Sequence, residues 1–139
     1  MIGDRMIRQL DDKVLVSGQI RADDIAALRE QGVTMIVNNR PDGEEPGQPL
    51  GMEIEEAVSA AGMEYRSIPI IRGIGPADAD AMQDPINPTR GKMLAFCRSG
   101  TRSALAWAVA KSEEGMPREE IERRLSSADV DPTPIAHLL

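Results

Sequence analysis

The chain has 139 residues, 41% of them hydrophobic, and a net charge of −7. This length supports one compact domain with its own core, and it is too short for two ordinary domains. The negative charge disfavours binding to nucleic acids and to anionic membranes, because such binding usually requires a basic surface. No stretch approaches the roughly 18 apolar residues of a membrane span, and residues 1–14 lack the apolar stretch of a signal peptide, so we expect a cytoplasmic protein.

The cysteine and histidine content limits the chemistry further. Cys97 is the sole cysteine, which excludes an intramolecular disulfide and a cysteine-rich zinc site. His137 is the sole histidine, and it has no partner at metal-ligand spacing. We therefore expect neither a metal nor a cofactor. Nothing in the sequence determines the oligomeric state.

Short apolar segments alternate with helical ones along the chain. Strands are predicted at 13–18, 33–39, 63–70 and 92–96. Helices are predicted at 21–32 and 50–61, from 103 onward, and at 116–129, and residues 71–91 allow one short helix that begins near Pro76 and is interrupted by Pro85. This alternation predicts an α/β fold, a single three-layer domain with a mainly parallel sheet of four or five strands flanked by helices.

Two segments follow predicted strands at the edge where such folds bind ligands. Residues 40–51 carry three prolines and three glycines, and a loop of this length in a small domain indicates a functional role. Cys97 follows the strand 92–96 and precedes the helix that we expect from 103. Ligands in α/β sheets bind at the carboxyl ends of the strands, so we expect residues 39–42 and Cys97 to lie close together.

The heptapeptide CRSGTRS, residues 97–103, is typical of an anion-binding loop. Gly100 permits a tight turn in which successive backbone N–H groups point inward above the start of a helix. Such a nest, with added positive charge from Arg98 or Arg102, favours a thiolate at Cys97 and a nucleophilic role for it. The alternative interpretation is a buried cysteine that behaves as a small hydrophobic residue.

This loop resembles those of two enzyme families. Protein tyrosine and dual-specificity phosphatases carry His-Cys-x-x-Gly-x-x-Arg-Ser, and Cys97, Gly100, Arg102 and Ser103 match its residue types. Arg102 follows the cysteine by five positions in place of six, however, and Phe96 replaces the histidine. Rhodanese-type sulfurtransferases use a shorter loop of this kind, and its tighter ring of N–H groups suits a persulfide sulfur better than a phosphoryl group.

The rest of the chain resembles phosphatases more closely. The segments SGQ (17–19) and NNRPDGEEPGQP (38–49), the strand from Tyr65 to Pro69 and the cysteine loop are similar to a bacterial phosphatase family that also occurs as a domain of beta-lactamase-hydrolase-like proteins. The resemblance covers about residues 10–115 of a predicted single domain 1–139, with 116–139 as a helical extension. It implies a dual-specificity-phosphatase-like fold, with Cys97 as the nucleophile and Arg102 as a ligand of phosphoryl oxygens.

A phosphatase of this kind also needs an acid to protonate the leaving oxygen. Dual-specificity phosphatases place an aspartate after the third strand, but residues 70–75 contain none, and we interpret Asp78 and Asp80 as acids at a helix start. The 40–51 loop offers Asp42, our candidate for the acid, together with Glu44 and Glu45; the alternative is a solvated charged turn.

The remaining site residues follow from the loop and from its neighbours. Ser103 is expected to hydrogen-bond the thiolate or to cap the helix, and Arg40 and Arg72 are expected to widen the positive rim or to pair with nearby acids. The predicted substrate-binding residues are Arg98, Ser99, Gly100, Thr101, Ser103 and Arg40.

The sequence leaves three functions open. The first is a cysteine-dependent phosphatase-like hydrolase that forms a phosphocysteine at Cys97. The second is a sulfurtransferase that forms a persulfide at Cys97, and the third is a non-catalytic module that binds an anion or a partner. The expected substrate of an enzyme is a small phosphorylated or sulfane-sulfur compound.

Overall fold

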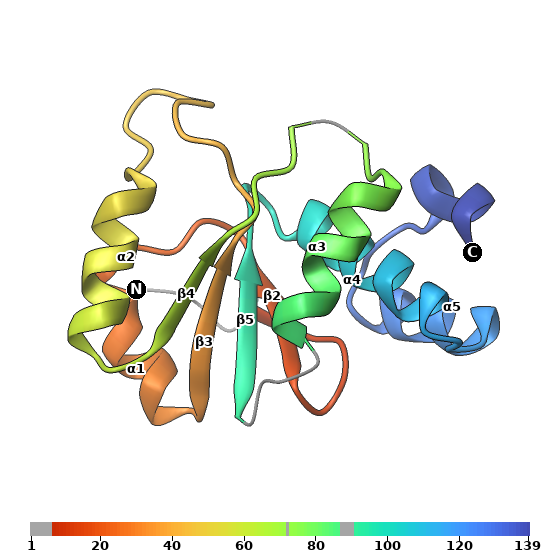
Figure 1. The fold of residues 1–139 in the computed structure, drawn as a ribbon, viewed down its shortest axis with the longest axis horizontal. Coiled ribbons are helices and arrows are strands. Elements are labelled where there is room, and N and C mark those ends of the chain that lie inside the picture. The colour runs from red at the N-terminus through yellow and green to blue at the C-terminus, as the bar shows by residue number, and fades with distance from the viewer. Residues whose placement is uncertain (1–6, 72, 87–90) are drawn as a thin grey trace.

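The computed structural model describes residues 7–71, 73–86 and 91–139, and its centre is a five-stranded sheet (Figure 1). The strands are β1 (Ile7–Gln9), β2 (Val14–Ser17), β3 (Val33–Asn38), β4 (Glu64–Ser67) and β5 (Lys92–Phe96). They lie in the order β1-β2-β5-β3-β4, with β1 antiparallel to β2 and the other pairs parallel. The predicted α/β class with a mainly parallel sheet is confirmed.

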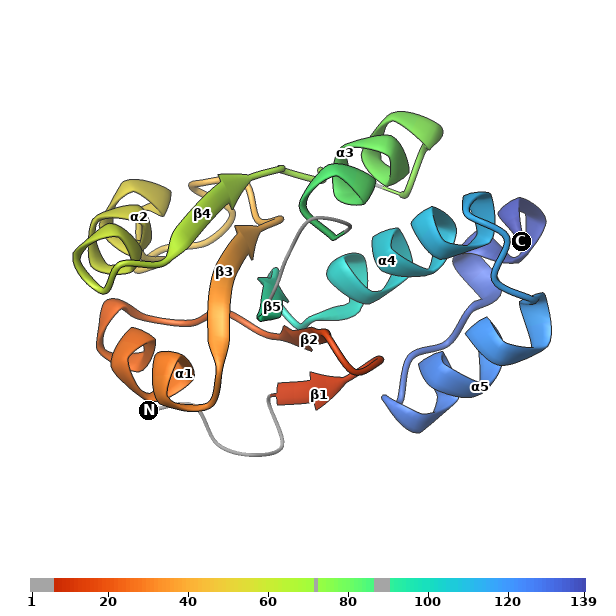
Figure 2. The same ribbon diagram turned by 60° about the horizontal axis from the view of Figure 1, so that its bottom comes forward.

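Helices cover both faces of this sheet. They are α1 (Ile25–Glu30), α2 (Gly51–Ala60), α3 (Pro76–Ile86), α4 (Thr101–Glu113) and α5 (Arg118–Ser127), with short 3-10 helices η2 (Ala22–Asp24) and η3 (Thr133–Leu138). Figure 2 shows α1 and α2 on one side of the sheet and α3, α4 and α5 on the other. Within the described residues, no helix is long and apolar enough to cross a membrane.

The sheet separates two hydrophobic cores because alternate residues of each strand face opposite sides. Val16 and Ala95 face the core beneath α4, whereas Leu15 and Leu94 face the core beneath α1 and α2. Strands β2, β3 and β5 are buried on both faces, as expected for parallel strands covered by helices. Helix α4 is buried over Ser103–Ala110, since it lies among the sheet, α3 and α5.

The register brings three strand ends to one edge of the sheet. Phe96 at the end of β5 pairs with Ser17 at the end of β2 and with Asn38 at the end of β3. The segments that follow these strands therefore meet around the residue after Phe96, which is Cys97.

The structure differs from the predicted elements in several places. Strand β4 ends at Ser67, three residues before the predicted end at residue 70. Strand β1 and the 3-10 helix η3 were not predicted. Helix α4 begins at Thr101, two residues earlier than expected, because Gly100 already turns the chain into it. Pro85 does not interrupt α3, since it lies in the last turn and the helix ends at Ile86, the next residue.

Candidate active site

Cys97 lies directly after β5 and has no exposed surface. Its backbone N–H donates to the Ser17 carbonyl over 3.3 Å, which anchors the start of the loop to β2. The Gly100 N–H donates to the Cys97 Sγ over 3.0 Å. The loop thus folds back on the sulfur, as the expected anion nest requires.

Gly100 adopts a φ of 95°, in the left-handed region that favours glycine, and it caps α4. A Cβ at this position would collide with the Arg8 guanidinium and would lie 3.3 Å from the Ser17 backbone. Because α4 starts at Thr101, its unpaired N–H groups and the positive end of its dipole adjoin the cysteine loop.

Arg102 lies in the first turn of α4 and holds the carboxylate of Glu44. Its Nη1 and Nη2 each donate to one Glu44 oxygen over 2.8 Å, and Nη1 also donates to the Ile70 carbonyl over 2.6 Å. The hydrogen bonds to Glu44, followed by the nearby Cys97 side chain, raise the pKa of Arg102. Arg102 therefore lies near the Cys97 side chain, and its two Nη atoms bind the Glu44 carboxylate.

Glu44 is shared between two arginines. Its Oε1 also accepts from the Arg40 Nε over 3.0 Å. The pKa of Glu44 falls to about 2, chiefly because Arg102 donates to it and also because Arg40 does, against the opposing effect of burial. The carboxylate is ionised at neutral pH and has no proton to give, so Glu44 does not fit the role of the acid.

Arg40 is buried and organises the loop that follows β3. Its Nη1 donates to Gln19, in the SGQ segment, and its Nη2 donates to Glu45, both over 2.9 Å. Glu45 also lies 3.5 Å from the exposed Arg98, and the hydrogen bond from Arg40 is the main reason that the pKa of Glu45 is lowered. Arg40 and Arg98 thus have carboxylate partners here, and their contact with a substrate remains a prediction.

Asp42 stands apart from these arginine pairs. Its Oδ1 accepts from the Gly51 N–H over 2.8 Å, at the first residue of α2. This bond satisfies one donor of the helix start and supports α2. No ion pair of Asp42 with an arginine occurs among the described residues. Its role as the acid remains a prediction.

The other predicted residues have structural contacts. The Ser103 hydroxyl donates to Asn39 Oδ1 over 2.8 Å, which ties α4 to the end of β3, and its bond to a thiolate remains a prediction. Ser99 and Thr101 are exposed, with their hydroxyl oxygens 3.2 Å apart. Asp78 accepts from the Gly75 N–H just before α3, which confirms it as an acid at a helix start. Arg72 lies outside the described residues.

Arg8 contacts the cysteine loop and was not predicted from the sequence. This residue lies on β1 and donates through Nη2 to the Ser99 carbonyl over 2.5 Å. A strand of three residues without an apolar run has no pattern that predicts it, and without β1 the arginine cannot be placed beside the loop.

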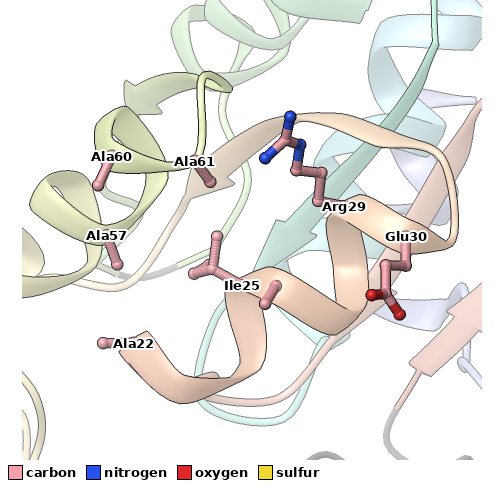
Figure 3. A pocket seen from close by; sticks show the side chains of 8 residues that line it. Ala22, Ile25, Arg29, Glu30, Ala57, Ala60 and Ala61 are labelled. Atoms are coloured by element: carbon pink, nitrogen blue, oxygen red, sulfur yellow. The ribbon is translucent and has the colours of Figure 1, made fainter.

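A groove of about 700 Å³ lies away from this site, between α1 and α2 (Figure 3). Figure 3 shows Ile25 and Arg29 of α1 facing α2, where the small side chains of Ala57 and of Ala61, the residue after the helix, form the opposite wall. None of residues 97–103 lines the groove. Among the described residues, His, Cys, Asp and Glu form no group of three or more that could hold a metal ion.

Comparison with known proteins agrees with this geometry. A profile of the phosphatase-like domain of beta-lactamase hydrolase-like proteins matches residues 6–114, which include every strand and the cysteine loop. The chain belongs to this family. Beta-lactamase hydrolase-like proteins of Xylella fastidiosa and Agrobacterium fabrum are 38% and 35% identical to the chain over 84% and 82% of its length. The chain spans about a quarter (27%) of the length of these relatives.

Solved structures show the same fold. A candidate phosphatase from Neisseria meningitidis is 29% identical to this chain, with a TM-score of 0.85. The match covers 99% of this chain and 100% of the Neisseria chain. TpbA of P. aeruginosa, solved as a cysteine-to-serine variant in complex with phosphotyrosine, has a TM-score of 0.68 at 15% identity. The match covers 99% of this chain and 84% of the TpbA chain. The fold is that of the cysteine-based phosphatases, as the sequence resemblance implies.

Proposed function

We propose that this domain is a cysteine-dependent phosphatase-like hydrolase with Cys97 as its nucleophile. The observation that carries the proposal is the hydrogen bond of 3.0 Å from the Gly100 N–H to the Cys97 Sγ, in a loop that adjoins the start of α4. Inward N–H groups and a helix start stabilise a thiolate and bind anionic oxygens. Membership of a phosphatase-like family supports the same reaction class.

In the proposed reaction, the Cys97 thiolate attacks phosphorus in line with the leaving oxygen. An S–P bond forms, the P–O bond to the leaving group breaks, and an acid gives its proton to the departing oxygen. Water then attacks phosphorus, and the S–P bond breaks. The attacking water gives a proton to the carboxylate, which becomes an acid again. Inorganic phosphate leaves, and the thiolate is restored.

We assign the acid to Asp42. Glu44 and Glu45 come from the same loop, but arginines hold both of them in the ionised form. The hydrogen bond that the structure gives the Asp42 carboxylate comes from the Gly51 backbone N–H, not from an arginine. Of the three carboxylates, Asp42 is the one that forms no ion pair with an arginine of the described residues.

Arg102 is the proposed ligand of the phosphoryl oxygens. A phosphoryl group requires the same forked donors that now hold Glu44, because bidentate recognition uses both Nη atoms. Binding therefore replaces the Glu44 carboxylate at Arg102, and Arg40 is the remaining partner of that carboxylate.

A second function is sulfur transfer, which the length of the loop favours. Arg102 is five residues after Cys97, one fewer than in the phosphatase pattern, so the loop encloses less space. In this reaction the thiolate attacks the outer sulfur of thiosulfate, the S–S bond breaks, and sulfite leaves. Cyanide then attacks the outer persulfide sulfur, and thiocyanate departs. Neither step needs an acid, which fits a site whose Glu44 is ionised.

A parallel turnover assay tests the two reactions. Wild type, Cys97→Ser and Asp42→Asn are assayed with an aryl phosphate and, separately, with thiosulfate plus cyanide. We expect phosphate release that disappears in Cys97→Ser and falls about 100-fold or more in Asp42→Asn. The Asp42→Asn variant retains a side-chain oxygen that accepts from the Gly51 N–H, so we expect it to keep the wild-type fold.

Other results of the assay would change the assignment. Thiocyanate formation that depends on Cys97, without phosphate release, would replace the hydrolase with a sulfurtransferase. Absence of both activities above the Cys97→Ser background would leave the domain as a binding module.

A further inference from the structure

Arg8 and Cys97 contact the two ends of one peptide group in the loop. The Ser99 carbonyl accepts from the Arg8 Nη2 over 2.5 Å, and the N–H of the same peptide unit, on Gly100, donates to the Cys97 Sγ over 3.0 Å. The peptide bond is trans, so its C=O and N–H point in opposite directions. Holding the oxygen toward Arg8 therefore turns the N–H toward the sulfur.

We infer that Arg8 is a positioning residue, which fixes the Ser99–Gly100 peptide so that its N–H stabilises the Cys97 thiolate. A charged donor on the carbonyl also polarises the peptide group, which makes its N–H a stronger donor. The inference rests on the proposed role of Cys97 as the nucleophile, but it holds for phosphoryl transfer and for sulfur transfer alike.

Two further contacts fix the Arg8 guanidinium itself. Its Nη1 donates to the Ala128 carbonyl over 3.0 Å, at the end of α5, so the side chain bridges that helix and the cysteine loop. Gly100 lets the guanidinium approach, because a Cβ there would collide with Nη2. Arg8 is thus held from β1, from α5 and from the loop.

Other charged groups lie in the loop and in the elements packed against it. They are Arg102 of α4, Arg98 within the loop, and Arg40, Glu44 and Glu45 of the segment after β3. Glu44 and Glu45 partly offset these three arginines, whereas no carboxylate among the described residues forms an ion pair with Arg8. Within the described residues, the Arg8 guanidinium at the Ser99 carbonyl is therefore not paired with a carboxylate.

The chain offers a matched control in Arg124. This residue also crosses the interface between α5 and the N-terminal segment, where its Nη1 donates to the Leu10 carbonyl over 2.9 Å. Both Arg8 and Arg124 have a buried Nε that lacks a hydrogen-bond partner in the described structure. Among the described residues, Arg124 bonds the Leu10 carbonyl and pairs with Glu120, and not with the cysteine loop. Its replacement therefore removes a similar tertiary contact without touching the Ser99–Gly100 peptide.

The experiment titrates the thiolate absorbance of the full chain in the ultraviolet, with Cys97→Ser as the blank. Since the chain has one cysteine, the signal belongs to Cys97 alone. We expect the midpoint to rise by about one pH unit in Arg8→Gln, to rise less in Arg8→Lys, which keeps the charge, and to stay unchanged in Arg124→Gln. Thermal unfolding checks that Arg8→Gln and Arg124→Gln are folded.

Each other outcome has a definite meaning. Equal midpoints in wild type and Arg8→Gln would overturn the role of Arg8 and leave Cys97 as the proposed nucleophile. Equal upward shifts in Arg8→Gln and Arg124→Gln would also overturn it, because the effect would be general loosening. A wild-type midpoint equal to that of free cysteine would overturn the inference and the proposed function together.

Discussion

At the scale of single residues, the charge of Glu44 bears on the proposed binding of a substrate anion at Arg102. Its carboxylate accepts three hydrogen bonds from Arg102 and Arg40, and its pKa of about 2 keeps it charged at neutral pH. A phosphate that binds Arg102 must therefore compete with a fixed negative charge a few ångströms away.

Replacing Glu44 with glutamine tests this competition. The Glu44→Gln variant retains an oxygen that accepts from an arginine but removes the charge, so we expect inorganic phosphate to bind about tenfold more tightly than in wild type. Isothermal titration calorimetry measures the change. Glu45→Gln is the control, because Glu45 contacts Arg40 and Arg98 and not Arg102, and we expect a smaller effect. Weaker phosphate binding in Glu44→Gln would show instead that the carboxylate orients Arg102 for the substrate.

At the scale of elements, the sequence predicts best where burial imposes a pattern. The strands 13–18, 33–39 and 92–96 are apolar runs, because β2, β3 and β5 are covered on both faces, and their predicted bounds agree with the structure within one residue. The turn at Cys97 was predictable for the same reason, since a buried strand and a buried helix flank it. Strand β1 carries Ile7, Arg8 and Gln9 at the edge of the sheet, where one partner strand and partial exposure impose no comparable pattern.

The partners of charged side chains could not be predicted in this way. The sequence places Glu44, Glu45 and Arg40 in one loop, but the choice among substrate binding, acid catalysis and pairing depends on distances across the fold. Arg102 is 58 residues from Glu44 along the chain, and no local spacing connects them. The contact of Arg8 with Ser99 spans 91 residues and is equally invisible to local patterns.

Replacing Gly100 with alanine adds one methyl group and tests the conformation of the cysteine loop. Gly100→Ala forces a side chain into a left-handed φ and against the Arg8 guanidinium and Ser17. Gly115→Ala is the matched control, because its φ is 101° and nothing lies within 4 Å of the added Cβ. We expect a loss of about 1–2 kcal/mol in the free energy of unfolding for Gly115→Ala, and a larger loss for Gly100→Ala.

The reactivity of the Cys97 thiol also distinguishes the two glycine variants. We expect the rate of Cys97 alkylation at neutral pH to fall in Gly100→Ala and to stay at the wild-type value in Gly115→Ala. Urea denaturation and mass spectrometry of the alkylated protein supply the two measurements. Unchanged alkylation in Gly100→Ala would mean that the inward N–H groups do not activate the sulfur.

At the scale of the whole molecule, the residues beyond the family match complete one of the two cores. The family profile ends at residue 114, yet Ile121, Leu125 and Ile135 are fully buried in the core beneath α4. The Ala128 carbonyl, at the end of α5, also accepts a hydrogen bond from Arg8. The extension therefore contributes to the core and to the contacts behind the cysteine loop, which favours the prediction of a single domain over residues 1–139.

Leu125→Ala tests whether this domain unfolds as one unit. Removing a fully buried leucine side chain is expected to lower the free energy of unfolding by about 2–5 kcal/mol, whereas Leu50→Ala, at a side chain 46% exposed, is expected to change it by less than about 0.5 kcal/mol. Two probes follow urea denaturation. The fluorescence of Trp107, the sole tryptophan, reports on α4, and the reaction of Cys97 with a bulky thiol reagent reports on the loop.

In a single cooperative domain, the two probes share one midpoint, and Leu125→Ala moves both by the same amount. That result is expected because α4 contacts α5 on one side and begins at Thr101, within the cysteine loop, so the loop cannot keep its shape once α4 is released. If the tryptophan signal moved to lower urea while the thiol stayed protected at its wild-type midpoint, the C-terminal extension would be a separate unit. Arg8 would then lose its Ala128 contact before the loop opens, and the bridge from α5 to the cysteine would have no part in keeping the thiol buried.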